Sequence, residues 1–200
     1  MISKGKLKEL ANEAINDERI FLKLLEDTLS KKDEIRFKSN NILNFISEKY
    51  PNKLYKKWDF FSDMLDSKNH YQRNIAINIL ANISKIDTEK KFEKNFDKYF
   101  DNISSNRTMV AGQAAINSGK IAKAKPHLQS KITEILLNID KIHKGKQTEL
   151  MKAYAINAFN DYFDDYGDKE KILKFVKEQF NSDSPKTKKA ASEFLNKWNK

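Results

Sequence analysis

Apolar residues recur every three or four positions along most of the chain, with polar residues between them. The stretch "RNIAINIL" (73–80) shows this spacing, and "RFKSNNIL" (36–43) stands 37 positions upstream with arginine, asparagine, isoleucine and leucine at the same places. A spacing close to 3.6 residues is typical of amphipathic helices. Five glycines and three prolines leave long runs without helix breakers. The pattern therefore predicts an all-α fold, and no stretch shows the alternation of a strand.

The repeat aligns on one small residue in each unit. Ser39 and Ala76 are equivalent, the tripeptide "AIN" extends the register, and "AASEFL" near the end of the chain completes it. The register residues are Ser39, Ala76, Ala115, Ala155 and Ala191, at spacings of 37, 39, 40 and 36. A small residue at this place lets two helices approach closely. A period of this length is typical of stacked helix pairs.

Each unit also contains a second apolar stripe at helical spacing. The four stripes are Leu54, Trp58, Phe61 and Leu65; Phe92, Phe96, Tyr99, Phe100 and Ile103; Ile132, Ile135, Leu136, Ile139 and Ile142; and Ile172, Phe175, Val176 and Phe180. Asp87, Pro126 and Ser184-Pro185 are expected to begin helices, and Gly167 to end one. We expect a single domain over 1–200, with a cap helix at 1–16 and repeats at approximately 17–51, 52–87, 88–125, 126–167 and 168–200.

The paired-helix period and the "R-x-x-A-x-x-I-L" helix resemble the HEAT/armadillo class of α-solenoid. The resemblance covers roughly residues 17–200 and implies a right-handed α–α superhelix of about five helix pairs. The tetratricopeptide period of about 34 residues is close, but the tryptophan-to-proline signature of that family is missing here.

The resemblance also implies that the second helix of each pair lines a concave surface where partners bind. On a wheel of about 100° per residue, Asn78 lies nearly opposite the apolar side of its helix. The equivalent asparagines are Asn41, Asn78, Asn117 and Asn157. Each amide offers two donors and an acceptor, and armadillo proteins use such a row to bind an extended peptide backbone. Simple solvation of a polar face explains the same residues without a ligand.

A basic row accompanies the asparagines at Arg36, Arg73, Lys152 and Lys188, and Gly112 interrupts it. We include the first three among the expected contact residues. Three interpretations stay open: an ion pair inside the fold, for Arg73 with Asp63, Asp66 or Asp87; plain solvation; or contacts with phosphates or acidic side chains, which would be steeply salt-dependent.

The net charge of +10 is spread along the chain and keeps nucleic acid open as a partner. A DNA alkylation-repair glycosylase family built from HEAT-like repeats uses tryptophan, aspartate and arginine in its cleft. The stretch "KKWDFFSD" supplies Trp58, Asp59 and Asp63, and Arg73 follows. In that family the arginine comes from a later repeat, and Asp63 is one residue away from the expected spacing. The alternative function is therefore nucleic-acid binding without catalysis.

The residue types and motifs that are missing from the sequence argue against several kinds of site. The chain has no cysteine, its three histidines are scattered, and it lacks glycine-rich phosphate-binding motifs. No apolar run reaches the roughly 20 residues that cross a bilayer, and no signal peptide is evident. We expect a monomeric cytoplasmic protein, not an enzyme, with no cofactor, metal or membrane association. Its expected function is to recognise a protein or peptide as a scaffold or adaptor.

Overall fold

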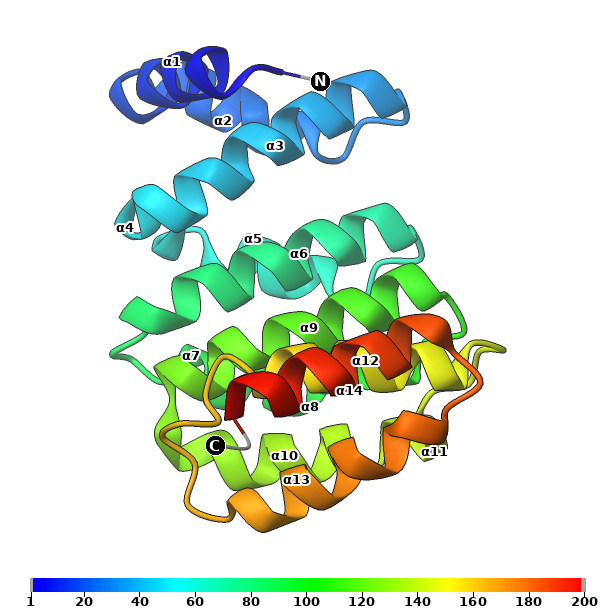
Figure 1. Ribbon diagram of the computed structural model, residues 1–200. Coiled ribbons are helices and arrows are strands. Elements are labelled where there is room, and N and C mark those ends of the chain that lie inside the picture. Colours follow the sequence, from blue (N-terminus) through cyan, green and yellow to red (C-terminus); the bar gives the residue numbers. More distant parts are fainter. Residues whose placement is uncertain (1, 199–200) are drawn as a thin grey trace. The chain divides into compact units, whose positions relative to one another are not determined.

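The computed structural model describes residues 2–198, and within this range every regular element is a helix. The chain divides into two compact units, Met1–Asn95 and Phe96–Lys200. Figure 1 shows the order of the helices in each. The predictions of a single domain and of the repeat borders stay predictions.

The first unit is built around helix α3, which packs against α1 on one side and α6 on the other. The shorter helix α2 covers α3, while α4 and α5 lie against α6. Its helices are α1 (Lys4–Asn16), α2 (Glu18–Asp27), α3 (Asp33–Lys49), α4 (Pro51–Tyr55), α5 (Trp58–Met64), α6 (His70–Ile83), the 3-10 turn η1 (Ser84–Ile86) and α7 (Lys91–Lys94).

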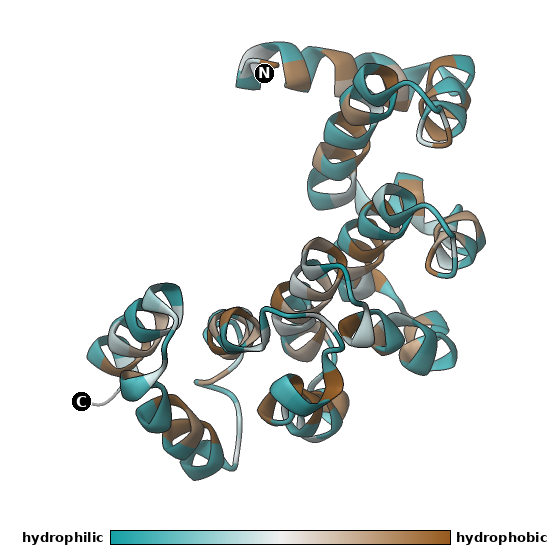
Figure 2. Ribbon diagram, turned by 90° about the vertical axis from the view of Figure 1, so that its right-hand side faces the viewer, coloured by the Kyte–Doolittle hydropathy of each residue, from teal (hydrophilic) through white to brown (hydrophobic). Residues whose placement is uncertain are grey.

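The second unit has α12 at its centre, between α9 and α14, with α10 and α13 forming a second layer. Its helices are α8 (Phe96–Phe100), η2 (Asp101–Ser104), α9 (Thr108–Ala124), η3 (Pro126–Leu128), α10 (Gln129–Leu137), α11 (Ile139–Ile142), α12 (Thr148–Phe159), α13 (Lys169–Glu178), η4 (Gln179–Asn181) and α14 (Pro185–Trp198). Figure 2 looks nearly along these helices and shows apolar residues where helices meet, with hydrophilic residues on the outer sides.

The small-residue register lies on the long helices. Ser39, Ala76, Ala115, Ala155 and Ala191 fall on α3, α6, α9, α12 and α14, and each is at most 2% exposed. A larger side chain here would hold neighbouring helices apart, so the small residue sets how closely they pack. All five register residues are thus buried on the long helices, as their small size in the alignment led us to expect.

The second stripes form shorter helices than the register helices, because each breaks at a turn. Their residues are mostly buried. Phe180 is 48% exposed, so the prediction that it belongs to the buried stripe is wrong. The backbone changes to a 3-10 turn at Gln179, and such a turn advances about 120° per residue instead of 100°. Gln179 is therefore buried instead, where its amide donates to the Phe175 carbonyl oxygen at 2.9 Å.

Two predicted helix starts are confirmed by their capping bonds. Asp87 accepts from the backbone N–H groups of Lys91 (2.9 Å) and Phe92 (2.8 Å), at the start of α7. Ser184 precedes α14, and its hydroxyl oxygen accepts from the Thr187 N–H at 3.3 Å. Both bonds satisfy donors that a helix start leaves without an intrahelical partner.

The predicted helix end at Gly167 is wrong. Helix α12 already ends at Phe159, and the chain continues through turns that bury Tyr162, Phe163 and Tyr166. Burial of three aromatic side chains outweighs continuation of the helix in this segment. Within residues 2–198, no helix combines the length and the apolar character that a membrane span requires.

Candidate binding face

In the first unit, Asn41 lies on α3 and Asn78 on α6, both half-buried. The Asn78 amide donates to the carbonyl oxygen of Asn74, one turn earlier, at 2.7 Å. The side-chain amide of Asn41 makes no hydrogen bond with any described residue. The two amides therefore differ. The Asn78 amide donates within its own helix, and the Asn41 amide has its donors and acceptor available for a ligand.

The second unit repeats this difference. Asn117 on α9 is 2% exposed and donates to the Gln113 carbonyl oxygen at 3.0 Å and to its side-chain oxygen at 3.3 Å. Asn157 on α12 is half-buried, and its amide has no hydrogen-bond partner between residues 2 and 198. Of the two members of the predicted row in this unit, Asn117 is buried, so Asn157 is the one that a ligand could reach.

Arg36 is buried, with 5% of its surface exposed, and its side chain connects parts of the fold. Its guanidinium pairs with the Asp33 carboxylate, donates to the Ser30 carbonyl oxygen at 2.8 Å, and lies 4.5 Å from the ring centre of Tyr71. These groups hold the turn between α2 and α3 and stack it on α6. Repeat alignment could not reveal this role, since the partners come from a connecting turn and from another helix.

Lys152 also forms ion pairs within the protein. Its ammonium group lies 2.6 Å from Glu149 and 3.6 Å from Asp140. Burial opposes the charge of Lys152, but these carboxylates outweigh burial and raise its pKa. The other carboxylate oxygen of Glu149 accepts from the Ser182 hydroxyl at 2.6 Å, and the bonds from Lys152 and Ser182 lower the pKa of Glu149. The cluster ties the start of α12 to the segment before α14.

The other positions of the basic row differ among themselves. Gly112 is buried beneath the Tyr154 ring of α12, which fills the space that a basic side chain would need. Lys188 is exposed and Arg73 is half-buried. The ion pairs expected for Arg73 stay predictions.

The tryptophan that suggested a base-binding cleft belongs to the core. Trp58 is 1% exposed and packs edge-on against Tyr55 and Phe92, with ring centres 5.8 and 6.4 Å away. Asp59 and Asp63 are exposed. A side chain enclosed in this way presents no face on which a nucleobase could stack. In the described part of the chain, no group of three or more histidine, aspartate or glutamate side chains gathers to hold a metal.

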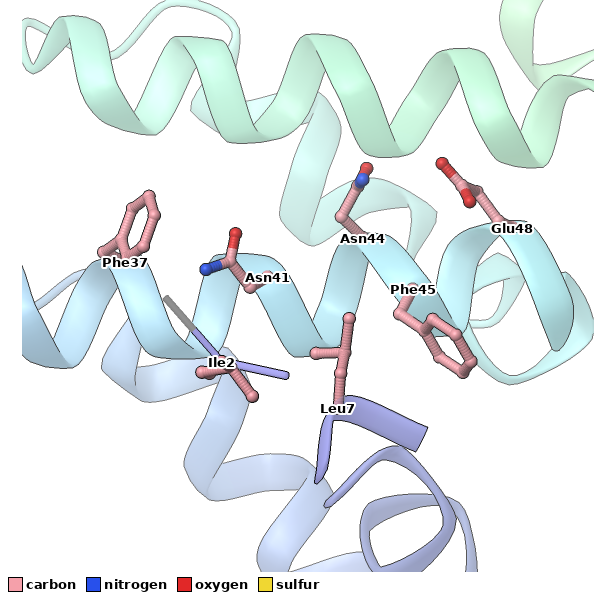
Figure 3. A pocket seen from close by; sticks show the side chains of 7 residues that line it. All are labelled: Ile2, Leu7, Phe37, Asn41, Asn44, Phe45 and Glu48. Carbon is pink, nitrogen blue, oxygen red and sulfur yellow. The ribbon is translucent and has the colours of Figure 1, made fainter. Parts of the chain in front are cut away.

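A groove in the first unit surrounds Asn41. It encloses about 300 Å³ and is lined by Ile2, Leu7, Phe37, Asn41, Asn44, Phe45 and Glu48. Figure 3 shows Leu7 and Ile2 approaching from the N-terminal segment, while the other five side chains belong to α3. Phe37 and Phe45 stand four residues before and after Asn41, so the three share one helix face. Sequence reasoning missed this groove, although that spacing was a usable signal.

Comparison with solved structures identifies the architecture. A designed armadillo repeat protein matches 96% of this chain and 91% of its own chain, with a TM-score of 0.59 at 15% identity. The chain has an armadillo-like repeat fold. Two engineered proteins also match 96% of the chain at 16% identity, with TM-scores of 0.56 and 0.52 and coverage of 90% and 88% of their own chains.

The sequence itself matches no family model and no curated protein. Among these comparisons, the match to solved structures recognises the armadillo-like repeat fold, and it confirms the fold class that the resemblance implied. Because one fold hosts many functions, the armadillo-like fold does not by itself determine what this protein binds.

Proposed function

We propose that this protein is a non-enzymatic scaffold that binds extended segments of other proteins on the long helices of each unit. The observation that carries the proposal is that each unit has one half-buried asparagine of the predicted row, Asn41 or Asn157, whose amide makes no hydrogen bond with another described residue. Each stands two residues after the register residue of its helix, Ser39 on α3 and Ala155 on α12. The armadillo-like fold supports the proposal, since the resemblance implies that such positions face a partner.

The chemistry of an amide suits this role. A peptide in extended conformation presents free N–H and C=O groups, and one asparagine side chain can donate to the carbonyl and accept from the N–H. The half-buried position of Asn41 and Asn157 reduces their hydration, which makes a bond from a ligand more favourable than at a fully exposed site. Recognition through the backbone would place few demands on the sequence of the bound segment.

Peptides selected by display on the intact protein, then synthesised with a fluorophore, test this proposal. The dissociation constant is measured by fluorescence anisotropy for the wild type, Asn41→Ala and Asn157→Ala. Loss of one or two hydrogen bonds of about 1 kcal/mol each predicts a roughly 5- to 30-fold weaker affinity. Asn16→Ala is the matched control, because Asn16 is exposed and its amide donates to the Asn12 carbonyl oxygen of its own helix.

Two results would contradict the proposal. Either no peptide is selected, or the selected peptides bind Asn41→Ala and Asn157→Ala as tightly as they bind the wild type. Duplex DNA that binds more tightly than any selected peptide at low salt, and is released steeply as salt rises, would favour the nucleic-acid alternative instead. The net charge of +10 makes this comparison necessary.

A further inference from the structure

A pocket rich in lysine is formed in the first unit by α2, α4 and the two residues after α4. It encloses about 380 Å³ and is lined by Glu18, Phe21, Asn52, Lys53, Lys56 and Lys57. The segment that supplies the lysines, residues 49–57, contains four lysines and no acidic residue. Three ammonium groups and one carboxylate give the lining a net charge of +2.

The three lysines of the pocket act on one point, the carboxylate of Glu18. The Lys53 ammonium lies 2.7 Å from Glu18 Oε2 and 4.9 Å from the ring centre of the buried Phe21, which fix its position. The Lys53 hydrogen bond lowers the pKa of Glu18 most, and the charges of Lys57 and Lys56 lower it further. Lys56 and Lys57 make no ion pair with any described side chain. The pocket thus holds an anion of its own chain and has positive charge left over.

Neighbouring acidic residues do not cancel this charge. Asp17 caps α2 by accepting from the Arg19 N–H at 2.8 Å, and it pairs with the Arg19 guanidinium at 3.1 Å. Glu48 lines the groove at Asn41 instead. Asp59, the next acidic residue along the chain, is exposed, lies outside the lining and pairs with no described side chain.

We propose that this pocket binds a phosphate monoester group, which displaces the Glu18 carboxylate from the lysines. Lys56 and Lys57 would donate to the phosphate oxygens, and the exposed Asn52 amide offers a further donor. The Glu18 side chain is 56% exposed and can turn into solvent, and an exposed ion pair of this kind is weak. The proposal is independent of the extended-segment binding above, because α2 and α4 are not among the long helices.

The charge of a monoester suits the pocket better than that of other anions. Near neutral pH a phosphate monoester carries about −1.5 to −2. A carboxylate carries a single charge and competes with Glu18, which is already tethered at the site. A nucleic-acid phosphate is a diester that also carries a single charge. Only the monoester gains fully from three ammonium groups.

NMR titration of the isotope-labelled full-length protein tests the proposal. The probes are inorganic phosphate and three peptides with one phosphoserine, glutamate or serine in a glycine–serine background. We expect inorganic phosphate and the phosphoserine peptide to shift the amide signals of residues 52–57, and the phosphoserine peptide to bind about 10-fold more tightly than the glutamate peptide. The ratio of the dissociation constants of phosphate and phosphopeptide then shows whether the pocket prefers a free phosphate or a modified side chain.

Matched variants locate the effect. Glu18→Gln should tighten phosphate binding about 3- to 10-fold, because it removes the internal competitor, while Lys56→Gln and Lys57→Gln should each weaken it about 5- to 10-fold. Glu178→Gln and Lys188→Gln are the controls, because both are exposed in the second unit and change the net charge by the same amount. The controls should change the affinity less than 2-fold.

Three results would overturn the proposal. If Glu178→Gln tightens binding as much as Glu18→Gln, net charge alone attracts the anion. If no phosphate probe shifts the signals of residues 52–57, the pocket is not a phosphate site. If duplex DNA shifts these signals at a lower concentration than the phosphoserine peptide does, the lysines contact a nucleic-acid backbone and the monoester assignment is wrong.

Discussion

Replacement of Gly119 by alanine should force α9 and α12 apart. The two helices meet where Gly119 faces Ala158. A methyl group at position 119 would lie 2.9 Å from the Ala158 Cα, closer still to the Ala158 carbonyl oxygen, and 2.6 Å from an Asp161 carboxylate oxygen. The Asp161 side chain is exposed and can move, but the Ala158 contacts are backbone atoms of a helix. Relief of the clash therefore requires a shift of a whole helix.

Two opposing effects determine how much Gly119→Ala changes the free energy of unfolding. Overpacking of a well-packed interior costs about 1–3 kcal/mol. Alanine is better than glycine inside a helix by about 1 kcal/mol. Because the clash involves backbone, we place overpacking near its upper limit. The free energy of unfolding should therefore fall by about 1–2 kcal/mol.

Two other glycines provide a graded control in the same assay. Gly5 on α1 has no atom near its missing Cβ, so Gly5→Ala should raise stability by about 0.5–1 kcal/mol. At Gly112 the methyl group would meet the Tyr154 ring at 2.7 Å, and a ring can rotate away. Gly112→Ala should therefore fall between the other two variants.

Urea unfolding followed by circular dichroism at 222 nm measures the series. The expected order of midpoints is Gly5→Ala above wild type, then Gly112→Ala, then Gly119→Ala. If Gly119→Ala is as stable as Gly5→Ala, the close backbone contact between α9 and α12 is wrong. If all three variants lose stability equally, the argument from local space is wrong as a whole.

Two further predictions concern ionisable groups. Because Lys152 and Ser182 lower the pKa of Glu149, its contribution to stability is present at neutral pH and is lost as the pH falls through that lowered pKa. Glu149→Gln should cost about 1 kcal/mol at pH 7, a modest value since the carboxylate is partly exposed, and progressively less as urea unfolding is repeated at lower pH; a cost that does not change with pH would refute this. Burial and the bond to Asp87 raise the pKa of Tyr55 to about 12. Asp87→Ala should lower this pKa in an ultraviolet titration and cost about 1–3 kcal/mol, because it also removes the cap of α7; an unchanged titration would contradict the bond.

Sequence periodicity was sufficient for the helical fold class and for the burial of the register residues. Helical spacing and small size are local properties, so Ser39 and Ala191 could be placed in the core without a structure. The same method failed at Phe180 and Gly167. At Gln179 the chain passes from the α-helix into a 3-10 turn, and α12 ends at Phe159, before turns that bury Tyr162, Phe163 and Tyr166.

The candidate site was only partly accessible to this reasoning. The wheel placed Asn41, Asn157, Asn117 and Arg36 in one predicted set of contact residues, but the four differ in the structure, where only Asn41 and Asn157 are half-buried. The structure buries Asn117, and it surrounds Arg36 with Ser30, Asp33 and Tyr71. Hydrogen-bond partners depend on which helices become neighbours, and repeat alignment carries no information on that.

The sequence by itself determined the helical repeat, since a 3.6-residue spacing and a recurrent small residue act within one helix and its immediate neighbour. Tertiary structure decided which polar groups stay free for a partner. Helix α1 and α3 together form the groove at Asn41, and the enclosure of Trp58 by Tyr55 and Phe92 removes it from any surface. Burial and hydrogen-bond satisfaction are properties of the packed neighbourhood, so they appear only when the helices are in place.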